Sequence, residues 1–407
     1  MKLVLICSAA FENNTLNCPS WIKGMISQLV SKHDITLFSY GKSDSDTVTF
    51  ENNVIGWIDA ASYTDPVLLS ELMKKEDPDV IVIFGTELNY SLSAVRLCVQ
   101  ANLMDKTVLF AQGLACACAE HYAEGVPEKV IKHWTLRDIL RRTNLCKEIK
   151  NMYKAAVNEK EAIIETRHFI GRSTLDKAVL RSYNPTAAYY HCNDILRSSF
   201  YEGEWRYEAC EPYRIFISQY YYPLKGFHYL LKAAALIKDK YPELKIVAAG
   251  YNPIEKSVLQ RELKDSSYIR YIKSLTKQLG LADHVEFTGV LSEERMKEEY
   301  LKANVFVLPS TIENSPNSLA EAMMLGVPCI ASDVGGVSDF ADHRKEAFLY
   351  PASSAHLLAY YLDTVFSDHE QASRLGENAK KRAKTDYDRT TNTAALERAF
   401  KTIAKKS

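Results

Sequence analysis

The sequence lacks several features that would assign it to a class at once. No apolar run reaches the ~20 residues that a membrane-spanning helix needs. The 407 residues carry a formal net charge of −1, so no global excess of positive charge exists to attract nucleic acid. No G-x-G-x-x-G follows the first strand expected in either half of the chain, which argues against a nicotinamide dehydrogenase. We therefore expect no nucleic-acid partner.

Motifs for metals and redox chemistry are also missing. The nine cysteines include no C-x-x-C, and the closest pair, Cys116 and Cys118, has the wrong spacing for a zinc knuckle. We expect reduced, partly buried thiols, as in other intracellular proteins. The acidic stretch "SDSDTV" at 43–48 falls between expected elements, where a turn is a better interpretation than a metal-binding D-x-D. No metal and no cofactor are therefore expected.

Strand-like apolar runs alternate with helical stretches along the whole chain. "KLVLIC", "DITLFSY", "DVIVIF" and "TVLFAQG" form a first series, and this order predicts parallel sheets with helices on both faces. The stretch "EGEWRYEACEP" at 202–212 has no apolar period, and a second series follows it with "LKIVAAG", "HVEFTG", "VFVLP" and "PCIAS". The chain is too long for one ordinary core. We expect domains at 1–208 and 209–390, with a closing helix at 391–407 that returns to the first.

The stretch "VFVLPSTIENSPNSLAEAMMLGVP" combines a strand end, a loop and a helix start. Ser315 is a favoured N-cap and Pro316 a favoured first helical residue, so a helix is expected to begin there. The free N–H groups of Asn317, Ser318 and Leu319 would then point from the carboxyl edge of the sheet toward a ligand. Because a helix amino terminus carries about half a positive charge, this ligand is expected to be a phosphate.

Two glutamates, eight positions apart, flank this helix start. A carboxylate would repel a phosphate, so each is expected to accept hydrogen bonds from hydroxyl groups: Glu321 from a ribose and Glu313 from a sugar ring. The spacing thus fits a nucleoside diphosphate sugar lying across the helix start. The alternative is that both glutamates are solvated, one capping the helix and the other on its exposed face.

The wider sequence around these glutamates carries a family resemblance. "HVEFTGVLSEERMKEEYLKANVFVLPS" and "PNSLAEAMMLGVPCIASDVGGVSDF" resemble the retaining glycosyltransferases of family 4, in the bacterial polysaccharide-type group 1. The resemblance implies the GT-B fold, an α/β fold with two Rossmann-like parallel-sheet domains facing across a cleft. It implies that Glu321 binds the nucleotide ribose, that Glu313 lies beside the donor sugar, and that amides after Ser315 meet the diphosphate. The backbone that would border the base is that of Gly289, Val290 and Leu291.

A lysine stands in the loop before the first helix of the second domain, in "SQYYYPLKGFHYLL". Lys225-Gly226 suits a diphosphate, because glycine lets the backbone approach, while a solvated loop lysine is the alternative. The resemblance implies an arginine five residues earlier, where this chain has Tyr220. We expect Tyr220 to lie among the donor-binding residues and Arg172, from "HFIGRSTLD", to supply the missing cation from across the cleft. Lys225 and Glu313 are the catalytic candidates.

Signals in the first domain are thinner, because the half that binds the acceptor varies with the acceptor. Related enzymes often carry a glycine pair where this chain has Pro19-Ser20, and a histidine where it has Gln112. Glu87 follows a buried strand and is expected at the cleft edge. His168 and Asp176 could face the acceptor, with capping and interdomain hydrogen bonds as an equal alternative. The acceptor-side candidates are Ser20, Glu87, Gln112, His168, Arg172 and Asp176.

The segment 128–150, "EKVIKHWTLRDILRRTNLCKEIK", is basic and amphipathic around Trp134. A basic amphipathic helix with a tryptophan can lie on an anionic membrane surface. A solvated helix of an ordinary domain has a similar charge and is the alternative. We expect a cytoplasmic protein that contacts the inner face of the membrane through this segment.

The resemblance implies a function. It is retaining, metal-independent transfer of a sugar from a UDP or GDP sugar to a hydroxyl of a glycan or lipid-linked acceptor, in the synthesis of capsular, exo- or cell-surface polysaccharide. Lys225 and the amides after Ser315 would stabilise the leaving diphosphate. The alternative is a catalytically silent GT-B subunit that only binds, because Tyr220, Gln112 and Pro19 depart from the active pattern.

Overall fold

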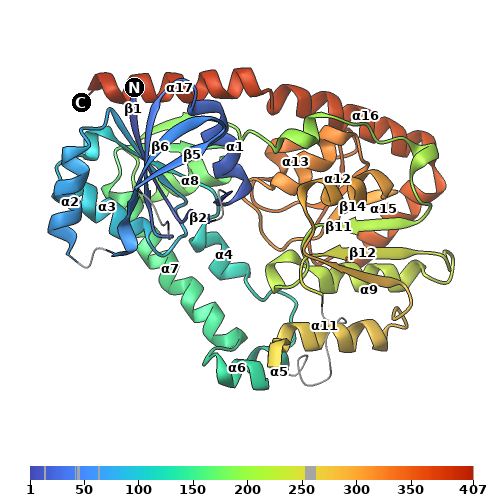
Figure 1. The fold of residues 1–407 in the computed structure, drawn as a ribbon. Helices are drawn as coiled ribbons and strands as arrows, with labels where there is room; N and C mark the ends of the chain where they lie inside the picture. Colours follow the sequence, from blue (N-terminus) through green and yellow to red (C-terminus); the bar gives the residue numbers. More distant parts are fainter. Residues whose placement is uncertain (13–14, 42, 44–45, 63–64, 253–262, 407) are drawn as a thin grey trace. The chain divides into compact units, whose positions relative to one another are not determined.

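The computed structural model describes residues 1–406 except 13–14, 42, 44–45, 63–64 and 253–262. It divides into two compact units. Unit 1 comprises Met1–Cys116, Lys154–Arg197 and Tyr387–Ser407, and unit 2 comprises Ala117–Tyr153 and Ser198–Asp386. Each unit is an α/β body built on a mainly parallel sheet, as the alternating pattern predicts (Figure 1). Unit 2 thus begins earlier than the expected position 209, and it also takes in a segment from the first half of the chain.

Unit 1 contains an eight-stranded sheet with the order β10-β9-β8-β7-β1-β4-β6-β5. Every pair is parallel except the β5–β6 hairpin, and β2 and β3 form a separate small hairpin. The strands are β1 (Lys2–Cys7), β2 (Ala10–Glu12), β3 (Thr15–Asn17), β4 (Asp34–Ser39), β5 (Thr47–Phe50), β6 (Asn53–Asp59), β7 (Val80–Phe84), β8 (Thr107–Phe110), β9 (His168–Gly171) and β10 (Ala188–His191).

The central strands of unit 1 are apolar on both faces because helices cover both. Side chains alternate along β1, so Leu3 and Leu5 pack on one side and Val4 and Ile6 on the other. The first side is covered by α1 and by α17, which comes from the end of the chain, and the second by α2, α3 and α8. The unit 1 helices are α1 (Ser20–Leu29), α2 (Pro66–Lys75), α3 (Ser91–Gln100), α8 (Thr174–Tyr183) and α17 (Arg389–Lys406).

Unit 2 contains a six-stranded, fully parallel sheet with the order β13-β12-β11-β14-β15-β16. The chain enters at β11, moves to one edge, and returns to the other side at β14. Ligands of open α/β sheets bind at the carboxyl ends of the strands beside such a reversal. The strands are β11 (Arg214–Ile217), β12 (Lys245–Ala249), β13 (Val285–Gly289), β14 (Val305–Leu308), β15 (Cys329–Ser332) and β16 (Phe348–Tyr350). The helices are α9 (Phe227–Ile237), α11 (Ser267–Gln278), α12 (Glu293–Lys302), α13 (Asn317–Leu325), α14 (Val337–Phe340), α15 (Ala355–Ser367) and α16 (His369–Asp386).

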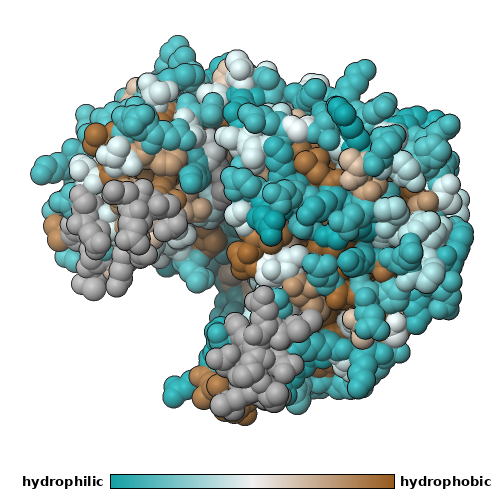
Figure 2. Space-filling model, turned by 45° about the vertical axis from the view of Figure 1, so that its right-hand side comes forward, coloured by the Kyte–Doolittle hydropathy of each residue, from teal (hydrophilic) through white to brown (hydrophobic). Residues whose placement is uncertain are grey.

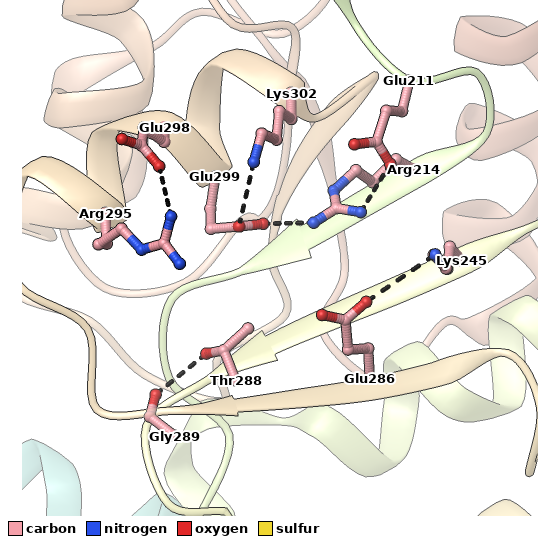
Figure 3. Close-up of polar contacts among 10 residues, drawn as sticks. All are labelled: Glu211, Arg214, Lys245, Glu286, Thr288, Gly289, Arg295, Glu298, Glu299 and Lys302. Atoms are coloured by element: carbon pink, nitrogen blue, oxygen red, sulfur yellow. Dashed lines mark hydrogen bonds and ion pairs between the residues drawn. The ribbon is translucent and has the colours of Figure 1, made fainter.

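The opposite, amino-terminal edge of this sheet holds charges that pair with one another (Figure 3). Arg214, the first residue of β11, is nearly buried and bonds to Glu211 at 2.7 Å and to Glu299 of α12. Lys245 at the start of β12 lies 3.9 Å from Glu286 of β13. These two cations therefore already have acidic partners within the protein.

The segment Ala117–Tyr153 belongs to unit 2 although unit 1 residues separate it from the rest of that unit in the chain. Val126 and Leu145 belong to the core that surrounds β11 and α9, and the Glu124 carbonyl accepts a hydrogen bond from His228 Nε2 at 3.0 Å. The single basic helix expected over 128–150 is wrong, because His133 is extended and Arg142 has a φ of +52°. The segment instead forms α4 (Ala115–His121), α5 (Glu128–Lys132), α6 (Leu136–Leu140) and the start of α7 (Leu145–Glu165).

Candidate functional site

The loops after β11 and β14 bring Lys225 and Glu313 into direct contact. Lys225 Nζ lies 2.6 Å from Glu313 Oε1, and the Ser310 hydroxyl donates to the same oxygen at 2.7 Å. The two charged side chains are 18% and 12% exposed. Burial alone would lower the pKa of Lys225, but the Glu313 carboxylate outweighs burial and raises it, so the lysine stays protonated. The two catalytic candidates therefore form one charged pair at the carboxyl edge of the sheet.

Gly226 makes this contact geometrically feasible. It has a φ of +63°, and a Cβ atom there would lie 1.7 Å from the carbonyl oxygen of Pro309 in the β14 loop. The Thr311 amide also donates to the Leu224 carbonyl at 2.8 Å. The two loops thus touch backbone to backbone, and only glycine permits so close an approach. This approach holds Lys225 beside Glu313.

Helix α13 begins one residue later than expected. Pro316 is the N-cap, with an extended ψ of 103°, and Asn317 is the first helical residue. The expectation of a free Leu319 amide is wrong, because that N–H donates to the Pro316 carbonyl at 3.0 Å. The amides of Asn317 and Ser318 donate to no group that the structure describes. They remain available to an anion.

The Ser315 hydroxyl adds a third donor at this point. Its oxygen is fully buried and has no hydrogen-bond partner among the described residues. A buried polar atom without a partner is costly and is usually satisfied by a ligand or water. One hydroxyl and two amides at the amino end of α13 therefore have no partner among the described residues, and a helix amino terminus of this kind suits a phosphate.

Glu321 lies inside unit 2, on the second turn of α13. It is 6% exposed, so the alternative that it is solvated on the exposed face is wrong. Glu313 does not cap α13 either, because the N-cap has no side-chain hydrogen bond and the Glu313 carboxylate contacts Lys225 instead. Both carboxylates are therefore held by the fold in the vicinity of the helix start.

Tyr220 does not face this site, so its expected place among the donor-binding residues is wrong. Its side chain is fully buried, and its ring packs 5.1 Å from that of Phe227 and 4.8 Å from that of Phe287. Its hydroxyl donates to the Tyr251 carbonyl in the loop after β12, and burial raises its pKa. The aromatic ring is thus a core residue that supports the β12 loop.

The carboxyl ends of β11, β12 and β13 form the wall of a cavity of about 510 Å³ within unit 2. Ser218 follows β11, Gly250 follows β12, and Val290 and Leu291 follow β13. Gly289 precedes them at the strand end, where its carbonyl accepts from the Gly250 amide at 2.8 Å and the Thr288 hydroxyl at 3.0 Å (Figure 3). The residues expected to border the base thus line this cavity or adjoin it.

Arg172 lies inside unit 1 and is not a replacement cation. It is 2% exposed and bonds to Asp194, to the Ala111 carbonyl at 2.5 Å and to the amide oxygen of Gln112. Burial lowers its pKa to about 10. The Arg172 guanidinium thus bonds to groups inside unit 1, and the expectation that it reaches toward the donor is wrong. The Gln112 side-chain oxygen accepts one of these hydrogen bonds.

Asp176 and His168 have structural roles inside unit 1, and the structure does not show them facing an acceptor. Asp176 forms a capping box with Ser173 at the start of α8 and accepts from the Arg172 amide at 2.7 Å. His168 is buried in β9, with Nδ1 3.1 Å from the Tyr190 hydroxyl. Both side chains therefore stabilise unit 1 from within.

Glu87 remains an acceptor-side candidate at the end of β7. One carboxylate oxygen accepts from the Gly113 amide at 3.1 Å, and the other is buried without a partner among the described residues. Burial raises the pKa of this carboxyl group. Ser20 is the first residue of α1.

Sequence reasoning missed another buried carboxylate in unit 1, that of Glu159. Glu159 accepts hydrogen bonds from the Ala115 amide at 3.0 Å and the Cys116 amide at 2.8 Å, which holds the amino end of α4. No local pattern in "NEKEAIIE" distinguishes this glutamate from its exposed neighbours. The part of the chain that the structure describes contains no cluster of three or more metal-ligating side chains, and none of its helices is long and apolar enough to cross a bilayer.

Comparison with known proteins adds to this geometry. Residues 208–382, which contain the Lys225–Glu313 site, match the family described as glycosyl transferases group 1. A glycosyltransferase of Methanocaldococcus jannaschii is 29% identical over 157 residues, which cover 39% of this chain and 36% of that protein. A glycosyltransferase of Escherichia coli named for colanic acid biosynthesis is 26% identical over 172 residues, 40% of this chain and 39% of that protein. The chain thus spans well under half of these relatives.

Solved structures resemble the chain over its whole length. Sucrose-phosphate synthase from Thermosynechococcus elongatus has a TM-score of 0.73 at 16% identity and covers 100% of both chains. HepE of Anabaena, solved in complex with UDP-glucose, has a TM-score of 0.68 at 14% identity over 99% of this chain and 100% of that one. At these identities the likeness is one of fold, and it agrees with the two parallel-sheet units described above.

Proposed function

We propose that this chain, whose residues 208–382 match the family described as glycosyl transferases group 1, moves a sugar from a UDP or GDP sugar to a hydroxyl group. The observation that carries the proposal is the convergence at α13. The loops after β11 and β14 pair a protonated Lys225 with Glu313, and the α13 start that follows carries a buried Ser315 hydroxyl and two amides without a partner among the described residues. Glu321 lies buried on the second turn of the same helix. The donors suit a diphosphate, and the carboxylates suit the hydroxyls of the rings attached to it.

The proposed chemistry follows from where charge develops. Breaking the bond between sugar and diphosphate leaves negative charge on the leaving group, beside Lys225 and the amides of Asn317 and Ser318. A unit charge pair at ~4 Å is worth about 4 kcal/mol at an effective dielectric near 20. We propose that these groups supply the positive charge without a metal. Glu313 would position the donor sugar and Glu321 the ribose.

The stereochemistry and the acceptor rest on resemblance. We propose retention of the anomeric configuration, with the departing phosphate taking the acceptor proton on the same face. The relative named for colanic acid biosynthesis supports a role in polysaccharide synthesis, with a glycan or lipid-linked hydroxyl as acceptor. Glu87, whose carboxyl group lies at the end of β7 in unit 1, is the residue that we propose for acceptor binding.

Membrane contact is supported by the surface around α6. Four large apolar side chains, spaced over seven residues, are 41–63% exposed there: Trp134, Leu136, Ile139 and Leu140. Several cations lie beside them in the sequence. Figure 2 shows hydrophobic surface at the lower end of the molecule, where Figure 1 draws α6. We propose peripheral binding to anionic lipid on the cytoplasmic side. Leu140→Ser should weaken sedimentation with anionic vesicles, whereas Val54→Ser, at an equally exposed site in unit 1, should not.

Release of nucleotide from a panel of UDP and GDP sugars tests the proposed activity. Glu313→Gln should lower turnover strongly, because it removes the charge that holds Lys225. Glu298→Gln is the matched control, since that glutamate is exposed and its partner among the described residues is Arg295, at 3.1 Å on α12 (Figure 3). The catalytically silent subunit is favoured by the buried Tyr220, which leaves the β11 loop without the family's arginine. Nucleotide binding without turnover on any acceptor would support that second function.

A further inference from the structure

The cavity at the carboxyl ends of β11, β12 and β13 has an exposed aromatic residue in its wall. Tyr221, from the loop after β11, lines this cavity of about 510 Å³ and is 40% exposed. Val290 and Leu291, whose backbone is expected to border the base, line the same cavity. Sites for small molecules are typically concave, with apolar and aromatic side chains and a few polar groups in their walls. Tyr221 is therefore placed to offer an aromatic surface to a ligand there.

The position of this ring is set by Gly250 at the end of β12. A Cβ atom on Gly250 would lie 2.8 Å from Tyr221 Cδ1 and 3.0 Å from Cε1, and the glycine has a φ of +118°. The ring thus lies directly against the β12 backbone, an approach that glycine permits because it has no side chain. The Gly250 amide donates in turn to the Gly289 carbonyl at 2.8 Å. The Tyr221 ring is therefore held beside the strand end that leads into Val290 and Leu291.

Tyr251 also lines this cavity, but contacts within unit 2 hold it. Its ring packs against the core, its hydroxyl donates to Asp265 at 3.1 Å, and its carbonyl accepts from the Tyr220 hydroxyl. Tyr251 is also less exposed than Tyr221. Tyr251 thus supports the wall of the cavity, and Tyr221 is the tyrosine better placed to contact a ligand.

Two contacts connect the Tyr221 ring to the catalytic candidates. The ring centroids of Tyr221 and Tyr222 are 5.1 Å apart, and Lys225 Nζ lies 5.7 Å from the Tyr222 ring centroid. The loop after β11 therefore carries an exposed ring and, a few residues later, the lysine that contacts Glu313. A nucleoside diphosphate combines an aromatic base with an anionic diphosphate, so this one loop offers a partner to each part.

We infer that the Tyr221 ring stacks on the base of the nucleotide donor. This inference rests on the proposed function and adds a side chain to the backbone that is expected to border the base. Stacking on an aromatic side chain tolerates different bases, because every base has a π-face. Tyr221 therefore contributes to the binding of a nucleotide with either base and contributes nothing to the binding of pyrophosphate.

Calorimetric titration of the full chain with UDP and with GDP tests this inference, with inorganic pyrophosphate as a ligand that has no base. Tyr221→Leu should raise the Kd of the nucleotide by about tenfold, the effect of losing one stacked base, and should leave the Kd of pyrophosphate unchanged. Tyr221→Phe keeps the ring and should bind nucleotide like the unmodified chain. Tyr360→Leu is the matched control, because Tyr360 is 57% exposed on α15 and is not among the described residues that line the cavity.

Three results would overturn this inference while leaving nucleotide binding by the unmodified chain intact. Unchanged nucleotide affinity in Tyr221→Leu would show that the ring does not contact the base. Equal losses for nucleotide and pyrophosphate would show that Tyr221 acts through the shape of the loop that carries Lys225. Equal losses in Tyr221→Leu and Tyr221→Phe would assign the effect to the hydroxyl group, and this comparison decides even where pyrophosphate binds too weakly for calorimetry. Absence of nucleotide binding by the unmodified chain would instead refute the proposed function.

Discussion

Replacing Gly226 with alanine tests whether the close approach of the β11 and β14 loops builds the site. The added Cβ would lie 1.7 Å from the Pro309 carbonyl oxygen, in a backbone conformation with φ of +63°. Gly326, the C-cap of α13, provides a control in the same unit. Its φ is +83°, but the nearest atom to a Cβ there is 3.5 Å away, on the flexible side chain of Lys380.

Both variants place a non-glycine residue at a positive φ, but only Gly226→Ala also creates a steric clash with another loop. A non-glycine residue in the left-handed region costs about 1–2 kcal/mol, and forcing the loops apart adds the ~1–3 kcal/mol typical of overpacking. Urea unfolding should therefore show a loss of about 2–5 kcal/mol for Gly226→Ala and about 1–2 kcal/mol for Gly326→Ala. Only Gly226→Ala should also weaken nucleotide binding, because it separates Lys225 from Glu313. Equal losses of stability and unchanged nucleotide binding in both variants would refute the reasoning.

Other predictions follow from the same contacts. Lys225→Ala should lower kcat by about 100-fold or more, as loss of a transition-state donor does, whereas Lys245→Ala, at an exposed pair on the amino edge, should leave kcat unchanged. Arg172→Ala should lower the free energy of unfolding by about 3–5 kcal/mol, because it leaves Asp194 buried without its partner, with the nucleotide Kd unchanged in calorimetry. Burial lowers the pKa of His228 from 6.5 to about 4, so the folded state binds fewer protons than the unfolded state. Stability should therefore fall by up to about 3 kcal/mol between pH 6.5 and 4, and His228→Gln should flatten that part of the urea-unfolding profile.

His228 also links α9 to the segment Ala117–Tyr153, through the Glu124 carbonyl. Its Nε2–H donates to the Glu124 carbonyl, which leaves Nδ1 to accept from the Tyr268 hydroxyl at 3.1 Å. A proton on Nδ1 would remove that acceptor in a buried position.

Local patterns predicted the parts of the site that are contiguous in sequence. The strand, loop and helix from 304 to 326 follow from apolar runs, a Ser-Pro pair and a closing glycine, and Glu313 and Glu321 fall on either side of the helix start. The start was displaced by one residue because Pro316 adopts an extended ψ. The Leu319 amide is not free because it makes an i to i−3 hydrogen bond to the Pro316 carbonyl in the first turn.

Contacts between distant parts of the chain could not be predicted in the same way. Tyr220 and Arg172 both lie next to loops that were expected to bind a ligand. The Tyr220 ring instead packs on aromatic residues in the core. The Arg172 side chain bonds to Asp194 and Gln112. The segment Ala117–Tyr153 joins unit 2 through Val126 and Leu145, which belong to the same core cluster as residues of β11 and α9. The hydrophobic periodicity of these segments predicts their secondary structure but not the distant residues that they contact.

A crystal structure of the chain with a bound UDP or GDP sugar tests the central claim most directly. The account predicts that phosphate oxygens lie within hydrogen-bonding distance of the amides of Asn317 and Ser318, the Ser315 hydroxyl and Lys225 Nζ. A nucleotide that binds elsewhere, or that leaves the amino end of α13 without a phosphate contact, would contradict it.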